Sequence, residues 1–161
     1  MLAPADLEDK YQIWIKEISY AKPVKDNDAK PAFALVNKGA GKAIKHGFGP
    51  DHLVQLAQFD QNYLDSSLLW TESDEKEPGF REIRMQSNTS AVFHAFYVNQ
   101  SDSNKALLEL RAPISGAKDQ RWKFQEITLS DVGDSSTTTP EKPSNEWDLS
   151  KADISFDGSR A

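Results

Sequence analysis

A chain of 161 residues has the usual length of one domain, and 38% hydrophobic with 10% aromatic residues excludes a wholly disordered protein. The net charge of −6 argues against duplex nucleic acid as the main ligand, because phosphate binding needs clustered Lys and Arg. The absence of cysteine excludes disulfides, thiolate metal sites and a cysteine nucleophile. We expect no membrane span and no signal peptide, since the sequence lacks a long apolar run and its start lacks a basic region.

The segment before residue 20 can be read in two ways. Apolar residues at helical spacing, with Asp6 as a possible N-cap, narrowly favour a helix on local evidence. The β-branched Ile13, Ile15 and Ile18 instead favour extended structure. The helical stripe would consist of Leu7, Tyr11, Trp14, Ile15 and Ile18.

The body from about residue 31 to 127 predicts short strands separated by turns. Residues 33–37 and 42–46 flank Lys38-Gly-Ala-Gly41, which is the pattern of a β-hairpin. Residues 121–125 alternate strictly and place Trp122 and Phe124 on one face of a strand. Many short strands at close spacing predict a barrel or a sandwich. Further strands are predicted at residues 53–57, 68–71 and 80–85.

The composition changes near residue 128. From Thr128 onward eleven residues are Ser or Thr, and seven acidic residues outnumber three basic ones. Such a segment buries too little apolar surface to offset its ordering entropy. We therefore expect a body over residues 1–127 and a disordered acidic tail over residues 128–161. Residues 145–149, which include Trp147, could dock on a partner or on the body, or could be an incidental aromatic segment.

A repeat connects three tryptophans. Gln12-Ile-Trp14, Leu68-Leu-Trp70 and Gln120-Arg-Trp122 place them 56 and 52 residues apart, which indicates one repeated unit. A Gln-x-Trp that closes each of three four-stranded lobes is typical of ricin-B-like β-trefoils. There the Trp fills the shared core and the Gln ties neighbouring backbone. The repeat favours a strand rather than a helix around Trp14.

Eight longer stretches of the sequence carry a further resemblance. They are residues 31–38, 43–46, 63–65, 69–73, 79–81, 83–85, 95–96 and 119–123. These stretches resemble the Euonymus-lectin domain of plants, in that family's order and at about its spacing over roughly residues 2–127. The resemblance implies an all-β, ricin-B-like β-trefoil that binds glycans. It also implies a cytoplasmic and nuclear lectin that is often linked to stress responses.

The repeat also predicts an incomplete first lobe. A lobe closed by Trp14 should have roughly 30 or more residues before it, and only 13 precede Trp14. A barrel that lacks strands exposes unpaired edges and core. We therefore expect self-association through strand edges, or poor folding.

The lobe that closes at Trp70 holds the candidate sugar site. Carbohydrate binding needs an aromatic platform under the apolar face of the sugar ring, with carboxylate and amide groups for the hydroxyls. In the alternative reading Phe59 and Tyr63 are core residues, and Asn62 and Asp65 are turn residues. The candidate residues are Lys45, His46, Phe59, Asn62 and Asp65.

The lobe that closes at Trp122 departs from the family pattern. His94 stands where the family has Asp, and residues 106–111 replace a tryptophan-rich strand. No aromatic residue lies between Val98 and Arg121. This lobe is thus predicted to lack both the carboxylate and the stacking surface of a sugar site, with His94 as a satisfied structural histidine.

Enzymatic readings find little support in the sequence. The three histidines do not have the His-Glu-x-x-His spacing of a metalloprotease. Gly39-Ala-Gly-Lys42 imitates a phosphate loop, but the earlier Gly and the following Ser or Thr are missing. We expect a glycan-binding module without catalysis, metal or cofactor. The alternative is a degenerate trefoil that has lost sugar binding and serves as a protein-interaction module.

Overall fold

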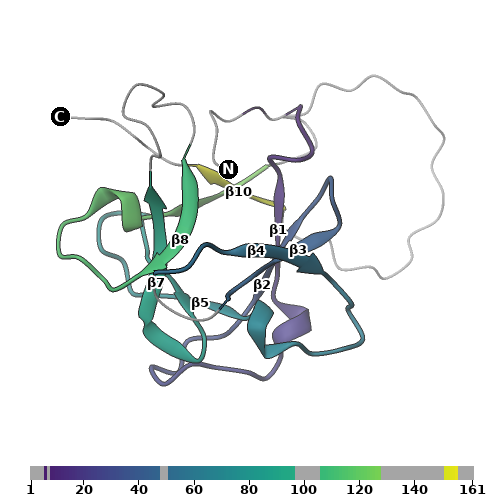
Figure 1. Ribbon diagram of the computed structural model, residues 1–161, viewed down its shortest axis with the longest axis horizontal. Helices are drawn as coiled ribbons and strands as arrows, with labels where there is room; N and C mark the ends of the chain where they lie inside the picture. The colour runs from purple at the N-terminus through teal and green to yellow at the C-terminus, as the bar shows by residue number, and fades with distance from the viewer. Residues whose placement is uncertain (1–5, 7, 48–50, 97–105, 128–150, 156–161) are drawn as a thin grey trace.

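The computed structural model describes residues 6, 8–47, 51–96 and 106–127, and the backbone of residues 151–155 (Figure 1). This part of the chain is all-β, as predicted, with ten strands, three short 3-10 turns and no α-helix. None of its helical turns is long and apolar enough to cross a membrane. The strands are β1 Trp14–Glu17, β2 Ala34–Asn37, β3 Lys42–Lys45, β4 Gln55–Gln58, β5 Trp70–Glu72, β6 Ile83–Met85, β7 Asn88–Phe96, β8 Leu107–Arg111, β9 Lys123–Glu126 and β10 Lys151–Ser155. The 3-10 turns are η1 Ser19–Ala21, η2 Ser66–Leu68 and η3 Lys118–Gln120.

The strands form two antiparallel sheets. One has six strands in the order β4-β3-β2-β1-β10-β9, and the other has four in the order β5-β6-β7-β8. Isolated bridges join the sheets where Phe33 meets Trp70 and where Arg81 meets Trp122. In each bridge both residues donate an amide to the other's carbonyl, over 2.8 to 2.9 Å. The two sheets are therefore parts of one closed structure.

One succession of elements occurs twice along the chain. Three strands, a 3-10 turn and a fourth strand occur in this order in β2-β3-β4-η2-β5 and again in β6-β7-β8-η3-β9. We call residues 33–72 lobe two and residues 81–126 lobe three. In the described residues only β1 and the turns around it remain of a first lobe. The architecture is the incomplete β-trefoil that the sequence predicts.

Aromatic side chains fill the centre between the lobes. The rings of Trp70 and Phe93 lie 4.5 Å apart between centroids, and those of Phe93 and Trp122 lie 6.0 Å apart. All three side chains are buried. The indole Nε1 of Trp70 donates to the Ile44 carbonyl at 3.0 Å, and that of Trp122 donates to the Phe93 carbonyl at 3.4 Å. The prediction that these tryptophans fill a shared core is confirmed.

The glutamines of the two Gln-x-Trp triplets bind backbone at the same offset. The Oε1 atom of Gln120 accepts the Ile114 amide at 2.7 Å, and that of Gln12 accepts the Asp6 amide at 3.0 Å. Gln120 is buried and also donates to the Ala112 carbonyl at 2.9 Å. The predicted role of the glutamine in tying neighbouring backbone is confirmed. The segment before residue 20 contains the strand β1 and no α-helix among its described residues.

Several strands begin or end elsewhere than predicted. The run at 68–71 divides into η2 and β5, because Asp65 accepts the Ser67 amide and turns the chain before Trp70. The run at 80–85 becomes a strand only at Ile83, after a turn in which Gly79 has φ of 80°. The nine-residue β7 was not predicted, because it opens with polar residues, Asn88-Thr-Ser90, that are typical of turns.

The predicted disordered tail differs from the structure at five residues. Residues 151–155 form β10, which pairs with β1 on one side and with β9 on the other. In Figure 1 this strand (yellow) lies beside β1. Both neighbours offer unpaired backbone groups, and such groups order a segment whatever its side chains. The other residues of the predicted tail, 128–150 and 156–161, lie outside the described part of the chain. They include residues 145–149, for which a docking role was considered.

Candidate functional site

The loop between β4 and η2 is anchored by Tyr20, which follows β1. The Tyr20 hydroxyl donates to the Tyr63 carbonyl at 2.8 Å and accepts the Asp65 amide at 2.7 Å. Asn62 is exposed, and its own amide donates to the Asp60 carboxylate at 2.9 Å. One hydroxyl and one carboxylate thus fix the path of residues 60–65.

Asp65 and Lys45 lie together at the end of β3. The Oδ1 atom of Asp65 accepts from the Ser67 amide at 2.9 Å and from the Ser67 hydroxyl at 2.5 Å. The other oxygen, Oδ2, lies 3.7 Å from Lys45 Nζ, and about a third of each side chain is exposed. The Ser67 hydrogen bond, with help from Lys45, holds the pKa of Asp65 below its usual value although burial opposes it. A charged acceptor and a charged donor are therefore adjacent at the surface.

His46 and Phe59 pack inward. His46 Nε2 lies 3.2 Å from the Ser66 carbonyl, and its ring meets the Trp70 ring edge-on at 5.6 Å. Phe59 packs against Tyr20, with centroids 4.9 Å apart, and against the cluster that contains Leu68. The structure therefore brings Lys45 and Asp65 together. Phe59, the predicted platform for the sugar ring, instead packs against other side chains of the protein.

A different aromatic residue of the same loop is exposed, close to Asp65 in the sequence. Tyr63 is 70% exposed, and its neighbour Leu64 is 48% exposed. Leu56 on the sheet's outer strand β4 is also exposed. The reading of Tyr63 as a core residue is thus wrong. The signal that could have revealed its exposure is the polar turn Asp60-Gln-Asn62 directly before it.

A second polar cluster lies on lobe three. His94 on β7 stands opposite Glu109 on β8, with Nε2 3.9 Å from Oε1, and its Nδ1 lies 3.7 Å from Asp119 Oδ1. Within the described residues that Nδ1 has no hydrogen-bond partner. The expectation that His94 is a satisfied histidine is therefore wrong, and the structure places two carboxylates beside the position where His94 replaces the family's Asp. Sequence reasoning missed Glu109 and Asp119 because only the register places them next to His94.

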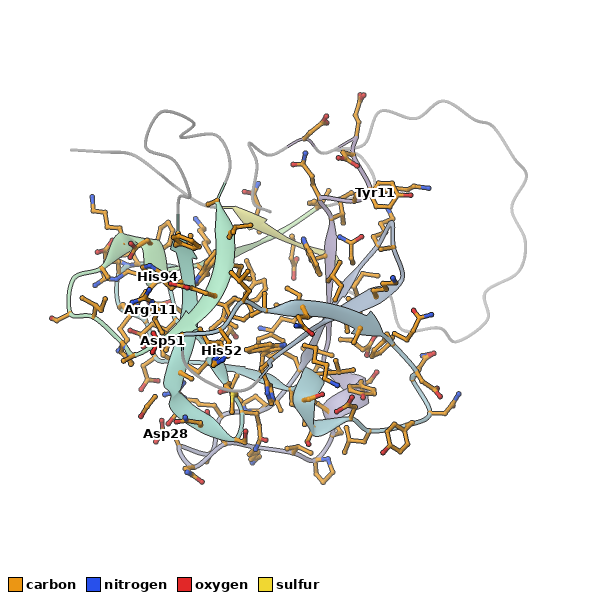
Figure 2. The ribbon with its side chains drawn as sticks, viewed as in Figure 1. Tyr11, Asp28, Asp51, His52, His94 and Arg111 are labelled. Carbon is orange, nitrogen blue, oxygen red and sulfur yellow. The ribbon has the colours of Figure 1, made fainter. Side chains whose placement is uncertain are left out.

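The carboxylate of Glu109 is already paired. Arg111 Nε donates to Glu109 Oε1 at 2.6 Å and lies 3.5 Å from Asp51 Oδ1. The bond to Glu109 raises the pKa of Arg111. Figure 2 shows Arg111, Asp51 and His94 on the same side of the molecule, along β7 and β8. One guanidinium group thus faces two of the carboxylates in this cluster, those of Glu109 and Asp51.

Lys45 and His94 hold equivalent positions in the two lobes. Each follows the residue whose carbonyl accepts the indole of the closing tryptophan, Ile44 in one case and Phe93 in the other. In each lobe this residue faces an aspartate at 3.7 Å. The repeat thus presents one surface position twice, and among the described residues only lobe two adds an exposed aromatic ring. The described residues contain no group of three or more His, Asp or Glu placed to hold a metal ion.

Comparison with known proteins adds an independent line of evidence. No protein-family model matches the chain. Over 97 residues it is 47% identical to the ricin B-like lectin R40G3 of Oryza sativa subsp. japonica. It is 46% identical to the ricin B-like lectins R40C1 of the same plant and EULS3 of Arabidopsis thaliana.

The matched residues are 60% of this chain but 48%, 28% and 31% of those three relatives. The chain thus spans about half the length of the first relative and less than a third of the other two. At this identity the sequences are homologous, and the resemblance to the Euonymus-lectin type is confirmed. Over the matched stretch this chain is similar to the ricin B-like lectins of plants.

Proposed function

We propose that the chain binds carbohydrate without catalysis, through the surface of lobe two formed by Lys45, Asn62, Tyr63 and Asp65. The observation that carries the proposal is the Lys45–Asp65 pair, in which Oδ2 lies 3.7 Å from the ammonium group, on the same loop as the exposed Tyr63. The relatives' name, ricin B-like lectin, supports the same class of ligand.

The arrangement matches the chemistry of a sugar. A vicinal diol offers both donors and acceptors, so one hydroxyl donates to Asp65 Oδ2 while its neighbour accepts from Lys45 Nζ. The Tyr63 ring can cover the apolar face of the pyranose. Because the site is open and both charges stay hydrated, we expect a Kd of about 1 mM for a monosaccharide.

The other two predicted residues have a positioning role in this proposal. His46 holds the end of β3 against Trp70, and Phe59 holds the loop against Tyr20. Their removal would displace Lys45 or the 60–65 loop without removing a contact to the sugar. Their loss therefore acts through the geometry of the site.

The test is an amide NMR titration of the labelled full chain with galactose- and mannose-type oligosaccharides. We expect saturable shifts at Lys45 and at residues 62–65, and at least a tenfold loss of affinity in Tyr63→Ala. Tyr11→Ala is the matched control, because Tyr11 is 58% exposed and lies in the turn before β1. Saturable shifts at His94, Glu109 and Arg111 instead would contradict the proposed location.

A second candidate function is protein interaction. It is favoured by the exposed apolar side chains of Leu56, Tyr63 and Leu64, which adjoin the outer strand β4. Such a patch beside a free strand edge suits a protein partner. Dispersed resonances that no oligosaccharide moves would favour this function over sugar binding.

We further propose that the module acts in the cytoplasm and nucleus, as the resemblance implies. A fluorescent fusion of the full chain in plant cells tests this placement. Fluorescence confined to the secretory pathway would contradict it.

A further inference from the structure

A gap between two strands of the larger sheet is filled by a distant segment. β1 and β9 do not pair with each other, because β10 lies between them and is antiparallel to both. Ala152 stands opposite Trp14 on one side and opposite Glu126 on the other. Without β10 the sheet would end at β1, and β9 would have no neighbour in it.

Side chains of the body set the width of this gap. Phe33, directly before β2, meets Phe124 of β9 edge-on, with ring centroids 5.8 Å apart. Lys16 of β1 places its Nζ 4.6 Å from the centre of one ring and 4.5 Å from the other, and pairs with Glu72 at 2.6 Å. These contacts link the two walls without involving β10. We therefore expect the gap to persist as a groove when the strand leaves.

The connection between β9 and β10 is much longer than the pairing requires. Glu126 at the end of β9 faces Ala152 at the start of β10, so a two-residue hairpin turn would be sufficient. The chain has residues 127–150 there instead. Fully extended, a segment of that length reaches about 80 Å. The covalent connection therefore allows β10 to enter the groove of another molecule.

We propose that the gap between β1 and β9 is a binding groove for an extended strand, and that β10 of a second copy enters it to form a strand-exchanged dimer. Backbone hydrogen bonds on both sides supply the affinity, as in other cases of strand addition. A tether of this length gives the chain's own strand an effective concentration of about 1 mM. Exchange between copies therefore increases as the protein concentration approaches that value.

The absence of native cysteine allows a direct test by crosslinking. Lys123 and Ser155 are Cα partners in the register of β9 and β10, at a spacing that a disulfide can bridge. Full-length Lys123→Cys and Ser155→Cys chains are unfolded together, refolded as an equimolar mixture and oxidised mildly. We expect at least tenfold more disulfide-linked heterodimer than from Lys123→Cys mixed with Ser136→Cys, the matched control. Raising the protein concentration should raise the yield.

The double variant Lys123→Cys/Ser155→Cys separates the two ways of filling the groove. Closure within single chains at low concentration, with heterodimers from the mixture at high concentration, supports the proposal. Closure within single chains but no heterodimer at any concentration would show that β10 does not exchange. Failure of both reactions would show that residues 151–155 do not occupy the groove, and either of these last two results overturns the proposal.

Discussion

Asp26 and Arg84 form an ion pair in which Arg84 Nη2 donates to Asp26 Oδ2 at 2.7 Å and the aspartate side chain is fully buried. The Thr71 hydroxyl donates to the same oxygen at 2.6 Å. The amides of Asp28 and Lys30 donate to Oδ1, each at 2.9 Å. The pair thus joins the loop before β2 to β5 and β6, in the smaller sheet.

Asp26→Asn should destabilise the fold strongly. The change leaves the buried guanidinium of Arg84 with only the exposed Asp28 as a counter-charge, and loss of one partner from a buried pair costs about 3 to 5 kcal/mol. Chemical denaturation followed by tryptophan fluorescence measures the free energy of unfolding. The control is Asp28→Asn, which removes the exposed partner of the same arginine and should cost about 1 kcal/mol or less. Equal losses in the two variants would contradict the importance of the buried pair.

Acid should weaken the fold in a defined pH range. Burial raises the pKa of Asp26, but bonds from Thr71, Lys30 and Asp28 and the charge of Arg84 together lower it below its usual value. Hydrogen bonds from Ser67 and Lys30 likewise lower the pKa values of Asp65 and Asp74. The unfolded chain therefore binds protons more tightly at these positions than the folded chain does.

The stability that these carboxylates confer is present above the usual aspartate pKa of about 4, and is lost as pH falls through their lower folded values. We expect the free energy of unfolding to decrease steadily below about pH 5. The decrease should be shallower in Asp26→Asn, since one of the three groups is gone. Denaturation between pH 2 and 6 measures how the free energy of unfolding changes with pH in both proteins. Equal slopes would show that Asp26 does not contribute to the loss of stability in acid.

Gln120→Ala should cost more stability than Gln12→Ala. The first change empties the buried position of the Gln120 side chain and removes its bonds to the Ile114 amide and the Ala112 carbonyl, which together should cost about 2 to 4 kcal/mol. Gln12 binds the exposed Asp6 amide, so its loss should cost about 1 kcal/mol or less. Thermal and urea denaturation measure the free energy of unfolding of both variants. The control is Gln125→Ala at an exposed position of β9, where we expect a loss of about 0.5 kcal/mol or less. The reverse order would contradict the difference in burial.

Tyr20→Phe should loosen the candidate site without touching its surface. The change leaves the Asp65 amide and the Tyr63 carbonyl without the hydroxyl that joins them, at a cost of about 1 to 2 kcal/mol. Hydrogen exchange at residues 63–65 should become faster, and sugar affinity should fall although Lys45 and Asp65 are unchanged. Unaltered exchange at these amides would show that the loop does not depend on Tyr20.

The repeat of tryptophans was the most informative part of the sequence for the fold. Side-chain alternation around Trp122 and the hairpin turn at Gly39–Gly41 are local signals, and both led to strands that exist. The strand β10 could not be predicted, because its pairing partners β1 and β9 lie far from it in the sequence and no local pattern reveals them. Composition measures side chains alone, and so it assigned those residues to disorder.

The candidate site was predictable only in part. The sequence places Lys45 and Asp65 in the same lobe, but exposure decided between Phe59 and Tyr63 as a platform, and exposure depends on where Tyr20 packs. The lobe-three cluster shows the same limit. His94 and Glu109 are brought together by strand register, which the residue pattern of β8 does not reveal.

The pairing of β1 with β10 also bears on how the protein is made. Trp14 leaves the ribosome long before its pairing partner Ala152 has been synthesised. At an elongation rate of about 5 to 20 residues per second, that interval is roughly 7 to 30 s. Throughout it, neighbouring nascent chains on one messenger RNA carry the same uncovered strand edge. Chaperone capture during translation should therefore concentrate on β1 and end once the final strand emerges.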